Sequence, residues 1–283
     1  MKLIKLGFFS VFISLLLSAC GGGDSNFSGV NTTNNNTPPQ TGNWFRPAPL
    51  STWQWQLQGP VNTSYNVDIY DIDLFDSSPE LIQNLQADGK KVICYFSAGS
   101  FENFRDDADQ FDVAYIGQPL DGFADERWLD IRATQVRDIM IARLDLAEQK
   151  GCDGVEPDNV DGYINNNGLN LSYDDQIDFN LFLSREAHAR GLSIGLKNDL
   201  YQIHDLVNHF DFAVNEQCFE FFDCGYLLPF VNQGKAVFHV EYDPIFIADD
   251  VTANLFCQDA DNLNFSTLVL PFDLDDSFRF SCF

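Results

Sequence analysis

Positive charge is scarce in this sequence. Its 283 residues include 42 Asp and Glu but only 16 Lys and Arg, which gives a formal net charge of −26. Nucleic acids and anionic lipid surfaces are bound through clustered basic side chains, so this balance argues against either as the partner. A cationic or neutral partner fits better, although solubility alone or a salty habitat would also explain so acidic a chain.

The sequence also lacks the common binding motifs for metals and phosphates. No CxxC pair is present, which argues against a zinc site. The Asp-rich residues 273–276 lack the ordered, glycine-containing pattern of a calcium loop. No glycine-rich phosphate loop follows the first predicted strand, and no Ser/His/Asp arrangement can be located. We therefore expect no metal and no cofactor.

The N-terminus carries a short apolar run between residues 6 and 17, after Lys2 and Lys5. A basic start, a short apolar core and the small residues of Leu17-Ser-Ala-Cys20 are typical of a secretory signal rather than a membrane span. The cysteine resembles that of a bacterial lipobox, which implies cleavage after residue 19 and lipid attachment to Cys20. An ordinary signal peptide with a chance cysteine is the alternative. Removal of residues 1–19, which include both lysines, makes the net charge −28.

Residues after the signal divide into a tether and a domain. Gly21 stands where a retention signal would have Asp, so we expect an exported protein, lipid-anchored at the outer membrane or cell surface of a bacterium. Residues 20–42 are rich in Gly, Ser, Thr, Asn and Pro and predict a flexible lipidated tether. Residues 43–283 contain no further low-complexity gap and have the length of one α/β barrel, which we expect to be a monomer.

Six cysteines follow Cys20, and an exported chain with an even number of cysteines favours disulfides. Cys218 and Cys224 flank a short loop and are predicted to pair. Cys257 and Cys282 are predicted to join the C-terminus to the last helical region. Two alternatives stay open for the remaining two, Cys94 and Cys152, which lie in or beside predicted strands: buried free thiols or a third bridge.

Apolar runs and turn residues predict eight strands and six helices. The strands cover residues 51–57, 67–75, 91–96, a short segment ending near 157, 192–196, 212–214, 236–240 and 267–270. The helices cover residues 81–87, 134–150, 174–190, 200–208, part of 219–233 and 247–258, with Asp174 or Asp175 as the third helix's cap. Residues 101–125 are polar with few periodic signals, and residues 128–131 predict a short strand or turn over the barrel mouth.

Alternating strands and helices imply a parallel sheet, and eight such units in 241 residues imply a closed (β/α)8 barrel. An open doubly wound sheet is the alternative, which the missing phosphate loop disfavours. The predicted strands end in polar residues, which would converge on one mouth of the barrel. These residues are Asp73, Ser97, Glu156, Asp158, Lys197, Asn198, Asp199, Asn215, Glu216, Glu241, Tyr242 and Asp273.

Carboxyl groups from different strands are what glycoside hydrolysis requires. One carboxyl group protonates the leaving oxygen, and the other acts as nucleophile or as base for water. The candidates are Glu156, Asp158, Glu216 and Glu241, and spacing alone does not choose among them.

Four segments together resemble glycoside hydrolase family 114. They are Val92-Ile-Cys-Tyr-Phe-Ser-Ala-Gly99, the stretch from Gly151 through Glu156-Pro-Asp-Asn159 to Gly162, Gly195-Leu-Lys-Asn198 and Asn215-Glu-Gln-Cys218. The characterised activity of this family is endo-α-1,4-polygalactosaminidase, and the resemblance covers nearly the whole domain. It implies a (β/α)8 barrel with catalytic carboxylates at the ends of the fourth and sixth strands. These positions are Asp158, assigned as nucleophile, and Glu216, assigned as acid/base, with the reverse assignment left open.

The resemblance implies a polysaccharide substrate of α-1,4-linked galactosamine, partly deacetylated and therefore cationic, which agrees with the acidic composition. Ammonium groups would be held by Asp73, Glu156 and Glu241, and sugar faces by Tyr95, Tyr163 or Tyr242. Lys197 would pair with the carboxylates and hold their ionisation state, with Asn198 beside it. Two alternatives stay open: a non-catalytic surface lipoprotein that binds a cationic amino-sugar polymer, and a hydrolase of another α-linked glycan.

Overall fold

The computed structural model describes residues 42–283. The predicted signal peptide, the lipidation site at Cys20 and all but the last residue of the predicted tether lie outside the described residues. Within residues 42–283, no helix is both long and apolar enough to cross a membrane.

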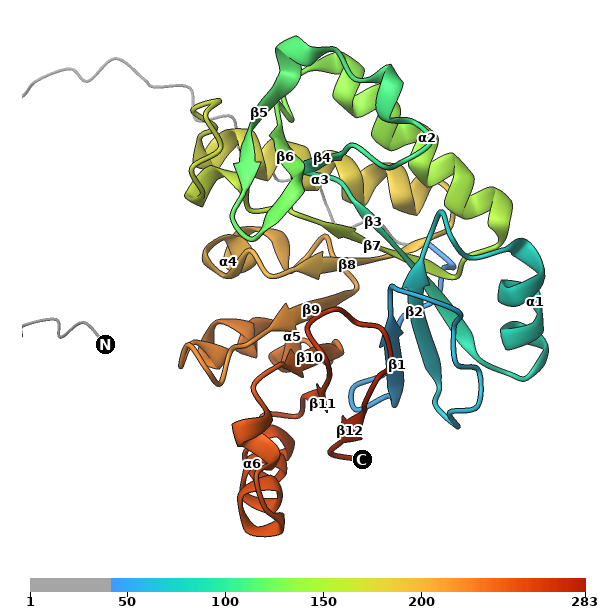
Figure 1. Ribbon diagram of the computed structural model, residues 1–283, viewed down its shortest axis with the longest axis vertical. Helices are drawn as coiled ribbons and strands as arrows, with labels where there is room; N and C mark the ends of the chain where they lie inside the picture. The colour runs from blue at the N-terminus through green and yellow to red at the C-terminus, as the bar shows by residue number, and fades with distance from the viewer. Residues whose placement is uncertain (1–41) are drawn as a thin grey trace, which may run out of the picture. The chain divides into compact units, whose positions relative to one another are not determined.

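Eight parallel strands form a curled sheet, and they are the eight that the sequence predicts (Figure 1). Each pairs in parallel with the next along the chain, so the predicted (β/α)8 barrel architecture is confirmed. In sheet order they are β1 (Trp53–Gln56), β2 (Ile69–Asp73), β3 (Lys91–Ser97), β7 (Gly154–Asp158), β8 (Ser193–Lys197), β9 (Phe212–Glu216), β10 (Val237–Glu241) and β11 (Ser266–Val269).

The C-terminal segment lies along the seam between the last and first of these strands. Its short strand β12 (Phe280–Ser281) pairs antiparallel with β11. Arg279 donates a hydrogen bond to the carbonyl of Trp53 in β1 (2.8 Å), and the Leu57 amide donates to the carbonyl of Leu274 (3.1 Å). These contacts satisfy backbone groups that a sheet edge would otherwise leave free.

Helices and 3₁₀ turns surround the sheet. The helices are α1 (Pro79–Ala87), α2 (Thr134–Lys150), α3 (Tyr173–Ala189), α4 (Ile203–Leu206), α5 (Leu228–Asn232) and α6 (Asp250–Asn262). The 3₁₀ turns are η1 (Ala108–Gln110), η2 (Val113–Tyr115), η3 (Gly162–Ile164), η4 (Leu200–Gln202), η5 (Cys224–Leu227) and η6 (Pro244–Ile247).

Four helical predictions differ from the structure. The helix predicted over 247–258 lies further along the chain, as α6, after the 3₁₀ turn η6. The cap of α3 is Ser172, which forms a capping box with Asp175, rather than Asp174 or Asp175. The helices predicted over 200–208 and within 219–233 are shorter, because each begins as a 3₁₀ turn. The helix predicted over 134–150 is present with those bounds, and Gly151 ends it in the left-handed conformation that glycine adopts without strain.

A second, three-stranded antiparallel sheet lies on the polar stretch for which the sequence predicts little structure. Its strands are β4 (Ser100–Glu102), β5 (Ile116–Leu120) and β6 (Phe123–Leu129), in the order β4-β6-β5. Most side chains of β6 are exposed, so the hydrophobic alternation that marks a half-buried strand is absent. Of the segment 128–131, predicted as a short strand or turn, Trp128 and Leu129 are the end of β6, and residues 130 and 131 follow it.

Three disulfides staple the domain. The two predicted pairs, Cys218–Cys224 and Cys257–Cys282, are present. Cys94 in β3 is joined to Cys152, just before β7, so of the two possibilities left open the structure has the third bridge.

Candidate active site

Three neighbouring barrel strands each end in a charged residue: Asp158 in β7, Lys197 in β8 and Glu216 in β9. In each case the next residue lies in the left-handed backbone region, with φ of 59° at Asn159, 49° at Asn198 and 63° at Gln217. This conformation turns the chain sharply as it leaves the sheet, and Asn tolerates it better than most residues. The sequence pattern of a charged residue followed by an amide residue thus ends three neighbouring strands at the mouth.

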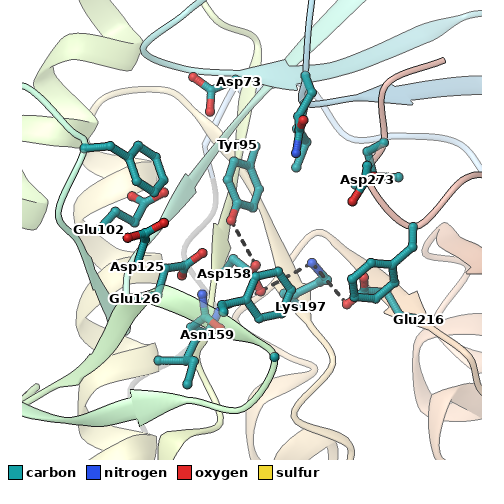
Figure 2. A pocket seen from close by; sticks show the side chains of 18 of the residues that line it. Asp73, Tyr95, Glu102, Asp125, Glu126, Asp158, Asn159, Lys197, Glu216 and Asp273 are labelled. Atoms are coloured by element: carbon teal, nitrogen blue, oxygen red, sulfur yellow. Dashed lines mark hydrogen bonds and ion pairs between the residues drawn. The ribbon is translucent and has the colours of Figure 1, made fainter. Parts of the chain in front are cut away.

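Lys197 is the centre of the site. Its Nζ lies 3.1 Å from Glu156 Oε1, 3.3 Å from Asp158 Oδ1 and 3.4 Å from Glu216 Oε2, and its side chain is 2% exposed (Figure 2). Burial alone would lower the pKa of the ammonium group, but the carboxylates of Asp158, Glu156 and Glu216 raise it well above its usual value. The lysine is therefore a permanent cation shared by three acids.

A pair of carboxyl groups lies behind this lysine. Asp71 and Glu156 are both completely buried in the barrel interior and interact with each other. Burial raises the pKa of Glu156 to about 7 although Lys197 opposes the shift. Burial and the neighbouring Glu156 raise the pKa of Asp71 well above its usual value. The two carboxyl groups thus share a proton at neutral pH, because two buried anions in contact repel each other.

Asp158 accepts a hydrogen bond on each of its oxygens. The Tyr95 hydroxyl donates to Oδ2 (3.0 Å), and the Asn159 amide donates to Oδ1 (2.7 Å). Its own carbonyl accepts from the amides of Ala98 and Gly99 (2.9 and 3.1 Å). A β-carbon on Gly99 would stand 1.7 Å from the Asn159 carbonyl oxygen, so only glycine allows this close approach.

Glu216 accepts hydrogen bonds from two side chains. The Tyr242 hydroxyl donates to Oε1, and the Asn198 amide group donates to Oε2 (3.0 Å). Asn198 Oδ1 in turn accepts from the backbone amide of Glu216 (3.0 Å). Both candidate carboxylates therefore lie beside the same cation, each with a tyrosine hydroxyl on its other oxygen.

These groups line a cavity of about 480 Å³ at the mouth of the barrel. Figure 2 shows Asp125 and Glu126 of β6 on one side of Asp158. Lys197, Glu216 and Asp273, which follows β11, lie on the other side. The lining contains eight Asp or Glu side chains and two basic ones, a formal net charge of −6. These are Asp73, Asp76, Glu102, Asp125, Glu126, Asp158, Glu216 and Asp273, with Arg105 and Lys197.

Six of the predicted site residues line this cavity: Asp73, Tyr95, Asp158, Lys197, Glu216 and Tyr242. Asp73 is among them, but Arg105 grips both of its oxygens (3.1 and 2.7 Å) and leaves the side chain 5% exposed. Asn198 lies just outside and contacts Glu216.

Besides Asn198, three predicted ligand residues do not lie on the cavity wall. Glu241 is completely buried on the other face of β10, where it accepts from the Phe219 amide (2.8 Å) and shares a hydrogen bond with His239 (3.0 Å). Tyr163 packs edge-on against Tyr173, with ring centres 5.4 Å apart. Glu156 is buried behind Lys197. None of these three side chains is placed to touch a sugar in the cavity.

Several lining residues had no distinct sequence signal. Trp55 from β1 places its ring under the Lys197 ammonium, 4.7 Å from Nζ, but its alternation predicted only a strand. Glu126 of β6 accepts from the Ser100 hydroxyl (2.7 Å), and burial raises its pKa to about 7. Phe272 follows β11 and contacts Tyr242 edge-on (5.3 Å). Glu126 could not be singled out from the sequence, because it lies in an acidic stretch without a periodic pattern.

Solved structures with the same fold include carbohydrate-active enzymes. Ega3 from Aspergillus fumigatus, crystallised in complex with galactosamine, is 43% identical; the match covers 85% of this chain and 100% of that one, with a TM-score of 0.80. The glycoside hydrolase domain of PelA from Pseudomonas aeruginosa is 14% identical over 82% and 98% of the chains (TM-score 0.65). Amy13B from Eubacterium rectale is 11% identical over 78% and 65% (TM-score 0.54). The last two show the fold alone.

A barrel of this kind, with paired carboxylates at its mouth and a relative at 43% identity, defines the protein as a glycosidase. The chain matches Glycoside-hydrolase family GH114 over residues 34–282, and it belongs to that family. A comparison with curated protein sequences gave no match.

Proposed function

We propose that this domain hydrolyses α-1,4-linked galactosamine-containing polysaccharide, with Asp158 and Glu216 as its two catalytic carboxyl groups. The observation that carries the proposal is their common contact with Lys197 in a cavity of formal charge −6. The galactosamine bound to Ega3, the relative at 43% identity, supports the choice of sugar.

The separation of the two carboxyl groups favours retention of configuration. The distances of 3.3 Å and 3.4 Å to one nitrogen limit Asp158 Oδ1 and Glu216 Oε2 to about 6.7 Å apart, a limit that only a straight line through Nζ would reach. Retaining enzymes have carboxyl groups roughly 5–5.5 Å apart, whereas inverting enzymes need roughly 6.5–9.5 Å to admit a water. Nearly the whole inverting range exceeds this limit.

We assign Asp158 as nucleophile and Glu216 as acid/base, the roles that the family resemblance implies. Each carboxyl group has a tyrosine hydroxyl on one oxygen, Tyr95 beside Asp158 and Tyr242 beside Glu216, and such a hydroxyl can rotate to accept a hydrogen bond when the carboxyl group is protonated. In these roles Glu216 gives a proton to the leaving oxygen and later takes one from water, while Asp158 attacks the anomeric carbon.

The charge of the cavity suits a cationic polymer. Its two basic side chains are already engaged, Arg105 by Asp73 and Glu102, and Lys197 by the acids at the centre. The remaining carboxylates, with Asp125, Glu126 and Asp273 among them, are left to attract ammonium groups.

We also propose that the protein is exported and anchored by lipid on Cys20, as a monomer on the outer membrane or cell surface of a bacterium. The N-terminal pattern of Lys2, Lys5, the apolar run and Leu17-Ser-Ala-Cys20 supports this. Replacement of Cys20 by Ser should move the protein from the membrane fraction to a soluble fraction. Equal partition of both forms would contradict the anchor.

The test of the activity is cleavage of α-1,4-galactosaminan by residues 43–283, beside the variants Asp158→Asn and Glu216→Gln. We expect oligosaccharides from the wild type and a loss of at least about 10³-fold in each variant. Glu148→Gln removes an exposed carboxylate from α2 and should leave the rate unchanged. Binding without cleavage by the wild type would replace the enzyme by a polymer-binding lipoprotein. Neither binding nor cleavage would require a different glycan.

A further inference from the structure

The loop that follows Glu216 is tied into a tight ring. Cys218 and Cys224 are joined by a disulfide with their Cα atoms 4.7 Å apart, and the sequence between them is Phe-Glu-Phe-Phe-Asp. The ring begins two residues after the catalytic carboxylate at the end of β9. Closing so short a loop restricts the directions in which its side chains can point.

The ring presents two phenylalanines to water. Phe222 is 94% exposed and Phe221 is 61% exposed. Phe222 also has a φ of 59°, a left-handed conformation that costs a bulky residue roughly 1–2 kcal/mol. An exposed phenylalanine side chain held in an unfavourable backbone conformation contributes nothing to the core. Backbone strain and exposed apolar surface of this kind are typical of ligand-binding sites.

Two tyrosines extend this surface to the neighbouring strand. Tyr201 lies in η4, four residues after Lys197 of β8, and is 61% exposed. Tyr226 lies in η5, directly after the disulfide-closed loop. Its aromatic ring is 5.4 Å from that of Tyr201, edge to face. We call these four residues, Tyr201, Phe221, Phe222 and Tyr226, the aromatic patch. Its residues lie in the segments that follow β8 and β9, the neighbouring strands that end in Lys197 and Glu216 (Figure 1).

The segment of chain that carries the aromatic patch has acidic side chains but no Lys or Arg. Glu220 and Asp223 lie in the ring itself, and the chain contains no Lys or Arg from residue 198 to residue 234. Aromatic faces attract cations, and Tyr and Phe rings also pack against apolar faces of a ligand. A surface of aromatic rings and carboxylates fits a cationic sugar polymer, and it repels the anionic headgroups of a bacterial membrane.

We propose that the aromatic patch is a second binding site for the galactosamine polymer, which holds the chain after it leaves the catalytic cavity. This inference rests on the proposed substrate. Such a site makes little contact with a short oligosaccharide that fills the cavity alone, but it adds contacts to a long chain and raises its effective local concentration. The patch should therefore distinguish substrates by length.

The test compares Phe222→Asn with wild type on long galactosaminan and on the shortest oligosaccharide that the enzyme cleaves. Asn removes the ring but accepts the left-handed backbone, so the fold should be kept. We expect about a tenfold rise in KM for the polymer, with kcat and the oligosaccharide constants within about twofold. Phe222→Tyr should behave as wild type, and so should Val113→Ala, which removes another exposed apolar side chain (80%).

Direct binding separates the possible failures. Co-sedimentation with insoluble polymer, in the Asp158→Asn background, should weaken about tenfold when Phe222→Asn is added. If the wild type cuts no galactosaminan, the proposed activity fails, and this binding difference still decides the role of the patch. Equal polymer binding and equal KM with and without the Phe222 ring would overturn the inference. So would loss of binding only to phosphatidylcholine/phosphatidylglycerol vesicles, which would make the patch a membrane contact.

Discussion

Replacement of Lys197 by Met tests whether one buried cation holds the active site together. Methionine has nearly the same length and shape, so the change removes the charge without opening a large cavity. Each contact of Nζ with Glu156, Asp158 or Glu216, at 3.1–3.4 Å, corresponds to about 5 kcal/mol of attraction at an effective dielectric constant of 20. Desolvation offsets most of this, and loss of one partner of a buried ion pair costs about 3–5 kcal/mol.

The loss should depend on pH in a definite direction. Lys197 lowers the pKa of Glu156, which burial holds at about 7, so the variant's Glu156 should titrate above 7. A carboxyl group with a raised pKa in the folded protein adds stability below its unfolded pKa and loses it as pH rises through the folded value. The deficit of Lys197→Met should therefore be small near pH 5 and reach about 3–5 kcal/mol near pH 8.

Urea unfolding followed by tryptophan fluorescence at pH 5, 6, 7 and 8 measures this deficit. The matched control is Lys150→Met, because the Lys150 Nζ donates to the carbonyls of Leu74, Phe75 and Ser77 (2.7, 3.0 and 2.8 Å), which do not titrate. Its deficit should stay constant over this range. A deficit of Lys197→Met that is equally flat would refute the bridging role. The kcat/KM of Lys197→Met should also fall by about 10²–10³-fold.

Two further predictions concern stability alone. Burial raises the pKa of Asp199 to about 9, so the folded protein keeps this side chain neutral at a free-energy cost that grows with pH. Asp199→Asn should therefore raise the free energy of unfolding by up to about 4 kcal/mol at pH 7 and by less at pH 5. Urea titrations at the two pH values measure this difference. A stabilisation equal at both pH values would mean that Asp199 is ionised in the folded protein. The bridge Cys94–Cys152 closes 58 residues and Cys218–Cys224 closes 6, so the double Ala variants should lose about 4 and about 2 kcal/mol in chemical unfolding. The reverse order would show that native-state contacts outweigh loop closure.

The barrel could be predicted because its strands are buried and bounded by turns. Runs such as Val92 to Phe96 and Leu192 to Leu196 have few other solutions, and the polar residues directly after them, Ser97 and Lys197, had to lie at the mouth. Asp158, Lys197 and Glu216 come together at the mouth because β7, β8 and β9 are neighbouring parallel strands, although Lys197 pairs in register with Val214, two residues before Glu216.

Which way a strand-end residue points was harder to predict. Both faces of β10 are buried, so its sequence shows no contrast between inside and outside, and Glu241 was expected at the mouth although it lies on the outer face. The next residue, Tyr242, is the one that reaches Glu216. Long-range pairing was equally hidden: Arg105 neutralises Asp73 from a segment 32 residues away that shows no periodic pattern.

The acidity of the chain takes on a specific meaning once the partners of each cation are known. Composition alone allowed solubility or habitat as the reason for a charge of −26. Those explanations require acids spread over the surface, but they do not require a cavity in which both cations are already shared among carboxylates. Arg105 and Lys197 leave the cavity wall with a formal charge of −6 and with Glu126 poised near neutral pH, its pKa raised to about 7 by burial. The carboxylates of this wall repel one another when the cavity is empty, and ammonium groups that enter the cavity reduce this repulsion. Binding of a cationic sugar and ionisation of the wall carboxyl groups must therefore favour each other.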